Sequence, residues 1–337
     1  MPSLEKPLLD LSFDTPPNQL RPLLDKAFQL TRRNFTNSIH FYFPGMVHFE
    51  ASFYESINRL RFPGISVTGN VCKLNCEHCR SQLLEGMVPA MTPEMLLKVC
   101  LEVRTAGGRG CLVTGGSLGD GSVPLMKFIP TLKRIKEELG LRVVVHTGLV
   151  DKGLAEALAD TGVDAAMIDI IGSDETIKQV YRLDRKVDEY EYSLLLLSER
   201  RIPIVPHVVV GIHYGQLRGE KTALEMIERH NPAAVVIVVL TPLHGTPMEK
   251  VLPPPPMAVA RVLLGARLIM PSTPLLLGCA RPRGPLKPTI DVLAIRAGAN
   301  GIAYPSEEAY IFARRLGLQV KLHEECCSLF WREFHLG

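Results

Sequence analysis

From residue 64 onward, short apolar runs alternate with stretches of helical periodicity, and this alternation limits the fold more than any other feature of the chain. The apolar runs contain few polar residues, as expected for parallel strands that are buried on both faces. Strict alternation of strand and helix indicates right-handed crossovers and a parallel α/β sheet. The expected strands are residues 64–71, 110–114, 142–146, 165–170, 204–210, 234–240, 275–279 and 301–304.

Eight such strands predict an α/β fold of the (β/α)8 TIM-barrel type over residues 61–318, and an open six-stranded partial barrel is the alternative. A chain of 337 residues is long enough for one such barrel. Residues 1–60 read as an N-terminal helical extension packed on the barrel, with a helical pattern at 19–35 followed by aromatic residues. Residues 319–337 read as a C-terminal tail that carries cysteines.

Three cysteines follow the first expected strand in a C-x3-C-x2-C run, at Cys72, Cys76 and Cys79. We call residues 69–80 the cluster loop. A [4Fe–4S] cube has four irons that are usually held by four thiolates, so three thiolates on one loop leave one iron open to another ligand. Zinc is the alternative, but zinc sites favour a second C-x2-C pair or a Cys/His set, and only His78 lies near.

Composition excludes some function classes and indicates a compartment. The chain is 46% hydrophobic and 22% charged, and its formal net charge of +3 gives no argument for nucleic-acid or membrane binding. No apolar run reaches the roughly 18 residues that span a bilayer. Without an export signal, eight cysteines indicate reduced thiols, so we expect a cytoplasmic protein with metal-bound or reactive thiols rather than disulfides.

Polar and small residues stand where the expected strands end, which is the face that carries the active site in such barrels. The second strand runs into Gly115, Gly116 and Ser117, and paired glycines allow a ligand to approach the backbone closely. The third strand ends at His146 and the fourth at Asp169. A buried Asp requires a partner or a ligand. We predict that these residues bind a cofactor; a simple turn, a core histidine and a helix cap or salt bridge are the alternatives.

A second set of cysteines lies near the end of the chain. Cys279 ends the seventh expected strand, and Cys326 and Cys327 are adjacent in the tail, where packing alone does not explain them. We hypothesise that these three residues hold a second iron–sulfur cluster at the carboxyl-terminal end of the barrel. Its fourth ligand would be Ser328, an arginine such as Arg281, or an exogenous sulfur. A redox-active vicinal disulfide and inert thiols are the alternatives.

The cluster loop and the Gly-Gly-Ser turn resemble those of the radical S-adenosylmethionine (SAM) superfamily. The resemblance implies a [4Fe–4S] cluster on the cluster loop with SAM on its open iron. One electron then cleaves SAM to a 5′-deoxyadenosyl radical, which abstracts hydrogen from unactivated carbon. It also implies that the turn at residues 115–117 receives the SAM ammonium, although Ser117 replaces the usual acidic residue. Asp169 would suit a ribose hydroxyl of SAM or a substrate amide. Arg182 and Arg185 would hold the SAM carboxylate, and a solvated helix face is the alternative for both.

Further segments, among them 277–284 and 298–303, resemble the archaeal biotin synthase-like proteins, and within them the two-protein lipoyl synthases. In that system two paralogous proteins place sulfur at C6 and C8 of an octanoyl chain that is amide-linked to a lysine of a carrier protein. An auxiliary [4Fe–4S] cluster is consumed as the sulfur donor. The implied partners are an octanoylated lipoyl-carrier protein, a paralogous radical SAM protein and an electron donor such as ferredoxin.

Departures from related patterns keep other functions open. Single-chain bacterial lipoyl synthases carry an N-terminal cysteine triad, but this chain has no cysteine before Cys72. Biotin synthase builds a [2Fe–2S] sulfur donor from cysteines on several strands plus an arginine; here Cys111 could match one of them, although we favour core positions for Cys111 and Cys100. The third and fifth strands contain no cysteine. A radical SAM methylase, a metallocofactor maturase and a non-catalytic iron–sulfur scaffold are further alternatives.

Overall fold

The computed structural model describes residues 6–56 and 58–333 and is built around one curled sheet of eleven strands. The order is β13-β1-β12-β11-β10-β9-β8-β7-β6-β4-β5, and every neighbouring pair in it is parallel. The strands are β1 (Ser38–Tyr42), β4 (Gly64–Ser66), β5 (Val88–Pro89), β6 (Gly110–Thr114), β7 (Arg142–His146), β8 (Ala165–Asp169), β9 (Ile204–Val210), β10 (Val235–Val239), β11 (Leu275–Leu277), β12 (Gly301–Ala303) and β13 (Gln319–His323). A separate antiparallel pair is formed by β2 (Glu50–Ala51) and β3 (Tyr54–Glu55).

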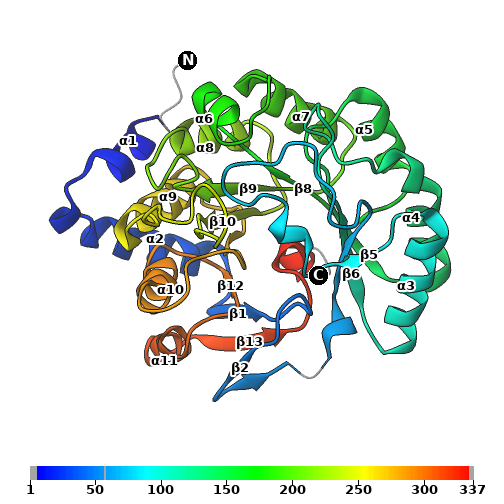
Figure 1. Cartoon of the computed structure of the whole chain (residues 1–337). Helices are drawn as coiled ribbons and strands as arrows, with labels where there is room; N and C mark the ends of the chain where they lie inside the picture. Colours follow the sequence, from blue (N-terminus) through cyan, green and yellow to red (C-terminus); the bar gives the residue numbers. More distant parts are fainter. Residues whose placement is uncertain (1–5, 57, 334–337) are drawn as a thin grey trace.

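The eight predicted strands are all present, as β4 and β6 to β12, so the α/β barrel-type fold class is confirmed. Strands β6 and β10 are buried along their whole length, which explains their unbroken apolar sequences. The sheet does not close into an eight-stranded ring, nor does it stop at six strands. It curls into a half-barrel whose free edges, within the described residues, are β5 and β13 (Figure 1).

Two strands lie where the sequence predicts an extension and a tail. β1 pairs with β12 on one side and with β13 on the other, so residues 38–42 and 319–323 belong to the barrel sheet. The predicted limits at residues 60 and 318 therefore do not divide this sheet. Residues 1–5 of the predicted extension and 334–337 of the predicted tail lie outside the described residues.

Helices cover the outer face of the sheet (Figure 1). They are α1 (Lys6–Asp14), α2 (Arg21–Asn34), α3 (Pro93–Thr105), α4 (Ile129–Leu139), α5 (Lys152–Ala159), α6 (Asp174–Gln179), α7 (Val187–Glu199), α8 (Glu220–Glu228), α9 (Pro256–Ile269), α10 (Leu286–Arg296) and α11 (Glu307–Arg315). Local capping explains several starts: Thr92, Asp151 and Ser306 accept hydrogen bonds from the first turns of α3, α5 and α11. None of the described helices is long and apolar enough to cross a membrane.

Two contacts bridge the open side of the half-barrel, from the segment before β4 to residues after β1 and after β13. The amide of Gly45 donates to the carbonyl of Phe62 at 3.1 Å, just before β4. Across the opening, Arg61 Nε lies 3.4 Å from a carboxylate oxygen of Glu324, just after β13. This side is thus joined by single contacts rather than by a strand ladder.

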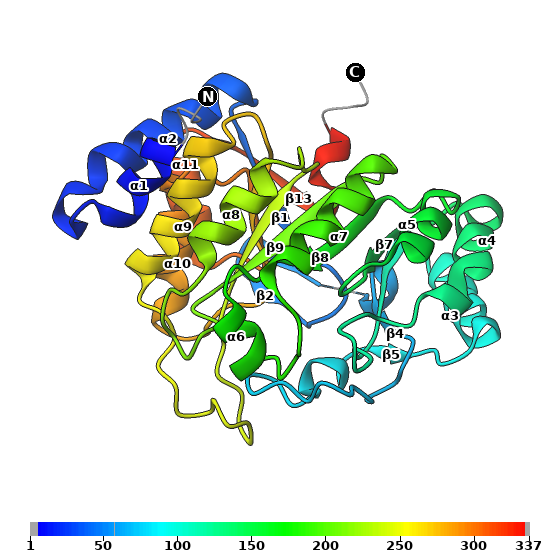
Figure 2. The same ribbon diagram turned by 90° about the horizontal axis from the view of Figure 1, so that it is seen from above.

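After β13 the chain turns into the barrel as a short 3-10 helix, Cys327–Glu333. Ion pairs hold it there, because Glu325 contacts Arg142 and Arg109, and Arg332 Nη1 lies 2.5 Å from Asp164. These three partners stand at or directly before the first residues of β6, β7 and β8. Figure 2 shows the tail (red) and the segment around the cluster loop (cyan) at opposite ends of the barrel.

Candidate active site

The cluster loop leaves the end of β4 through a tight turn and folds over the adjacent strand ends. Gly69 adopts a positive φ of 59°, and its carbonyl accepts a hydrogen bond from the hydroxyl of Ser66 at 2.6 Å. The amide of Lys73 donates to the carbonyl of Ser117 at 2.9 Å, which ties the loop to the turn after β6. The side chains of Cys76 and Cys79 are buried, and Cys72 is half-buried.

Gly116 lets the cluster loop lie directly on the end of β6. A Cβ atom there would stand 2.0 Å from the carbonyl oxygen of Val71 and 2.6 Å from Cα of Cys72. The amide of Gly116 is also held by the hydroxyl of Thr68, at 2.7 Å. The cluster loop therefore packs directly on the predicted Gly-Gly turn, and a side chain at Gly116 would force the loop away.

A cavity of about 170 Å³ opens between the cluster loop and the strand ends. The lining includes Cys72, Cys76 and Cys79 together with Gly115, Gly116, Ser117, His146 and Asp169, which are predicted site residues from four strand ends. It also includes His78 of the cluster loop itself and two aromatic residues that the sequence did not indicate, Tyr181 and Tyr190. The place of the two tyrosines follows from the fold of the 173–190 segment over the cavity and has no local sequence signal.

Asp169 and His146 form the polar wall of this cavity. His146 Nε2 lies 3.4 Å from Asp169 Oδ1, because β7 and β8 are neighbours in register. Burial by itself would raise the pKa of Asp169. The charge and hydrogen bond of His146, helped by the charge of His207, outweigh this effect of burial, so the pKa of Asp169 is lowered. Burial also lowers the pKa of His207 to about 4. The wall thus combines a carboxylate with imidazoles, suited to hydroxyl and amine groups of a ligand.

Arg182 does not line the cavity, although the sequence predicts a cofactor contact for it. Its guanidinium donates to the carboxylate of Glu77 in the cluster loop, with a 2.7 Å bond from Nε. The amide of Glu77 donates to the carbonyl of Val180 at 2.8 Å. Arg182 therefore fastens the 180–182 segment to the cluster loop. Arg185, the other arginine considered, is paired with Glu189 at 2.9 Å.

The cavity fits an iron–sulfur cluster with a further ligand. Cysteine thiols are the donors that such clusters use, and those of the cluster loop are free. The thiol of Cys76, followed by His78, holds the pKa of Cys79 at about 4, so that a thiolate is available. The hydroxyl of Tyr181 and Nδ1 of His78 are buried without a hydrogen-bond partner among the described residues. Such atoms indicate a polar ligand in the cavity.

Residues 66–228 match the family model described as the radical SAM superfamily. This segment is a radical SAM domain. The match begins in β4 and ends with α8, so it contains the cluster loop, the Gly-Gly turn, His146 and Asp169. The chain accordingly contains a radical SAM domain, and this family implies a [4Fe–4S] cluster and SAM as cofactors.

Known proteins agree with this domain. A biotin synthase of Allorhizobium ampelinum is 24% identical over 250 residues, which are 71% of this chain and 74% of that protein. In structure, methylornithine synthase (PylB) matches with a TM-score of 0.59 and 16% identity, covering 93% of this chain and 97% of its own. HydG, a maturase of the [FeFe]-hydrogenase, matches with a TM-score of 0.63 and 13% identity, covering 99% of this chain and 81% of the HydG chain. These structures share the fold of the radical SAM domain.

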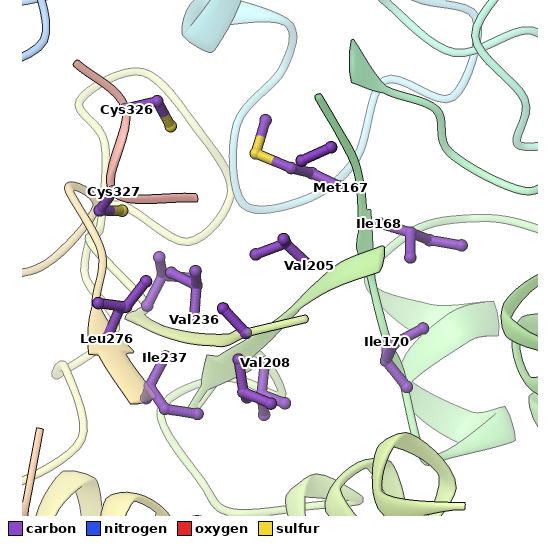
Figure 3. Close-up of a cluster of buried hydrophobic side chains, with 14 of the residues drawn as sticks. Met167, Ile168, Ile170, Val205, Val208, Val236, Ile237, Leu276, Cys326 and Cys327 are labelled. Atoms are coloured by element: carbon purple, nitrogen blue, oxygen red, sulfur yellow. The ribbon is translucent and has the colours of Figure 1, made fainter. Parts of the chain in front are cut away.

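The second set of cysteines lies apart from the radical SAM site: Cys279 is exposed, and the two tail cysteines are buried inside the barrel. Cys326 and Cys327 are buried at the start of the tail, beside Leu276 and across from Met167 (Figure 3). Cys279 follows β11, and its charge interacts with those of both tail cysteines. The tail packs on the starts of β6 to β8, whereas Cys279 follows the end of β11. That the three cysteines meet at the carboxyl-terminal end of the barrel stays a prediction.

A neighbouring thiol and a neighbouring hydroxyl lower the pKa of Cys326, one of the two tail cysteines. Hydrogen bonds from Cys327, and then from Ser328, lower the pKa of Cys326 to about 7 despite its burial. The hydroxyl of Ser328 lies 2.8 Å from the sulfur of Met167. Among the described residues, no three Cys, His, Asp or Glu side chains are arranged to hold a single metal ion.

Arg281 cannot be the fourth ligand of this set, which the sequence left open. Its guanidinium donates five hydrogen bonds: two to Asp291, two to the carbonyls of Gly278 and Ala303, and one to that of Tyr304. All its N–H groups are thus used. Arg281 instead fixes the segment that carries Cys279 against the end of β12.

Proposed function

We propose that this radical SAM enzyme inserts sulfur into an octanoyl chain on a lipoyl-carrier protein, as one component of a two-protein lipoyl synthase. The observation that carries the proposal is that the exposed Cys279 after β11 and the buried Cys326 and Cys327 of the tail act on one another's pKa. Two of these thiols come from the last part of the chain and one from the segment after β11, about 50 positions earlier. This supports a second [4Fe–4S] cluster as sulfur donor.

The biotin synthase relatives support sulfur transfer in general, but the contacts of Cys111 disfavour a donor cluster of the biotin type. Cys111 lies on β6, and its sulfur is 3.8 Å from that of Cys100 in the outer helix α3. The contact with Cys100, and after it burial, raise the pKa of Cys111 well above its usual value. Its thiol is therefore turned away from the barrel interior and stays protonated in the core, which agrees with the assignment of both residues to packing.

The chain's own residues have separate tasks in the proposed reaction. Cys72, Cys76 and Cys79 would hold the first cluster, while Gly115, Gly116, Ser117, His146 and Asp169 would bind SAM beside it. The bound cluster and SAM supply the radical that removes hydrogen from the octanoyl carbon. The protein positions that carbon and excludes water and oxygen. The anchored tail would hold the donor sulfur, with Ser328 or an exogenous sulfur at its fourth iron.

Incubation of the anaerobically reconstituted protein with SAM, dithionite and an octanoyl-lysyl peptide tests this function. We expect 5′-deoxyadenosine together with a peptide that has gained one sulfur, and a variant with Ala at residues 279, 326 and 327 should form only the nucleoside. The assay is run with and without the paralogous radical SAM protein that we propose as partner. Ferredoxin can replace dithionite as the electron source.

Each alternative function gives a different product in the same assay. A methylated peptide would favour a methylase. Formation of 5′-deoxyadenosine with an unchanged peptide, both with and without the paralogous partner, would favour a maturase. The fold shared with the HydG maturase keeps the latter a specific alternative. Cluster binding without any 5′-deoxyadenosine would indicate a non-catalytic scaffold.

A further inference from the structure

Tyr42, the last residue of β1, has a buried hydroxyl that nothing in the described structure satisfies. Its side chain is 2% exposed, and the hydroxyl has no hydrogen-bond partner among the described residues. The ring is fixed on two sides. It stacks on His323 of β13 with a centroid distance of 4.8 Å, and a Cβ on Gly301 of β12 would lie 3.0 Å from Cε2 of Tyr42.

The side chain of Tyr42 faces the inside of the barrel, where the tail lies. Residues two apart in a strand share a face, and His40 contacts Phe330 of the tail with ring centroids 4.7 Å apart. Burial, and after it the neighbouring Cys327, raises the pKa of Tyr42 well above its usual value, with Cys326 also contributing. Its hydroxyl is therefore a hydrogen-bond donor on the face of β1 that packs against the tail, whose cysteines act on its pKa.

Two carboxylates, those of Glu333 and Glu325, act on the pKa of Tyr42. Glu325 is paired with Arg142 and Arg109. Neither carboxylate accepts from the Tyr42 hydroxyl, which has no hydrogen-bond partner among the described residues. Thiol sulfurs are weak acceptors, whereas thiolates and sulfides bound to iron carry negative charge and accept more strongly. A buried hydroxyl left without an acceptor destabilises the fold by about 1–3 kcal/mol, so a missing acceptor at this place is informative.

We propose that the hydroxyl of Tyr42 donates a hydrogen bond to a sulfur of the second cluster and raises its reduction potential. This inference rests on the second cluster of the proposed function and adds a residue that tunes it. Hydrogen bonds to cluster sulfurs are one of the means by which proteins set these potentials, because they stabilise the more negative, reduced state. Tyr42 is thus a tuning residue and does not hold iron.

The test compares Tyr42→Phe with Tyr304→Phe in a full-length chain whose Cys72, Cys76 and Cys79 are replaced by Ala. Tyr304 is the matched control, since its ring lies near the same cysteines while its hydroxyl already donates to the carbonyl of Pro44. Each protein is reconstituted without oxygen from ferrous iron and sulfide. We expect equal iron and sulfide contents, a more negative midpoint potential for Tyr42→Phe, and no shift for Tyr304→Phe.

The possible failures are distinguishable. A folded parent that binds no cluster would overturn the second cluster and this inference together. Cluster binding with an unchanged potential in Tyr42→Phe, or loss of iron in that variant, would overturn the hydrogen bond and leave the second cluster standing. If the triple-Ala parent does not fold, pulsed EPR of the otherwise unaltered protein in D2O replaces it. A deuteron coupled to the second cluster must then vanish in Tyr42→Phe; its persistence would contradict the inference.

Discussion

The guanidinium of Arg281 and the carboxylate of Asp291 form an ion pair with side-chain exposures of 1% and 0%. Asp291 also accepts a hydrogen bond from the amide of Ser306 at 2.7 Å and one from Lys287 at 3.2 Å. The pair thereby joins the segment after β11 to the end of β12 and the start of α11. The position of Cys279 depends on this junction.

Replacement of Arg281 by Met should therefore destabilise the fold and displace Cys279. Removing Arg281 leaves the buried carboxylate of Asp291 with Lys287 as its remaining cationic partner among the described residues, so we expect the free energy of unfolding to fall by up to about 3–5 kcal/mol. Urea titration of the iron-free protein measures this change. Arg283→Met, at an exposed position two residues later, is the control and should alter the value by less than about 0.5 kcal/mol. Equal stabilities of the two variants would contradict the role of the pair.

Gly116→Ala should abolish cluster binding at the cluster loop. The added Cβ would collide with the backbone at Val71 and Cys72, which cannot yield without moving the loop. We expect iron at this site and 5′-deoxyadenosine formation to fall to background. Gly119→Ala, where nothing lies within 4 Å of the new atom, should behave as the unaltered chain. Iron analysis and chromatography of the nucleoside measure both effects, and full activity in Gly116→Ala would show that the loop does not need this contact.

Acid should destabilise the protein through His40. Burial, then the charges of His323, Lys321 and Arg32, lower the pKa of His40 to about 3. The unfolded chain, with a histidine pKa of roughly 6.5, binds this proton first, so stability is complete above that pH and is lost as the pH falls toward 3. This one group gives a slope of at most about 1.4 kcal/mol per pH unit.

His40→Gln should lower the slope of the unfolding free energy against pH by up to about 1.4 kcal/mol per pH unit, because unfolding then takes up one proton fewer. The measurement is the urea unfolding free energy of the iron-free protein at several pH values between 4 and 7. His244→Gln is the control, because the side chain of His244 is 95% exposed. Slopes that coincide for His40→Gln and the unaltered protein would show that His40 is charged in the fold.

The strands were predictable where the barrel buries both faces. Five consecutive apolar residues in β10 allow few other interpretations. β13 escaped prediction because it is a short edge strand with exposed and half-buried residues that include Gln319 and Lys321, and its pairing with β1 joins segments some 280 residues apart. No local pattern in the sequence reports such a pairing.

Within the candidate site, the residues at strand ends were predictable, because parallel strands bring their carboxyl ends together. His146 and Asp169 meet for this reason. The place of Arg182 was not predictable. Its backbone has a positive φ of 55°, and its side chain pairs with Glu77 rather than with a cofactor. Tyr181 lines the cavity through the same turn, and a sequence gives no measure of how such a loop folds back.

Transfer of labelled sulfur tests the central claim most directly. The protein is reconstituted with ferrous iron and ³⁴S-sulfide, freed of excess sulfide, and allowed to react once with SAM, dithionite, the paralogous partner reconstituted with unlabelled sulfide, and an octanoyl-lysyl peptide. We predict ³⁴S in the peptide, and its absence when Cys279, Cys326 and Cys327 are replaced by Ala. A peptide without ³⁴S, formed while the unaltered protein cleaves SAM, would contradict the account.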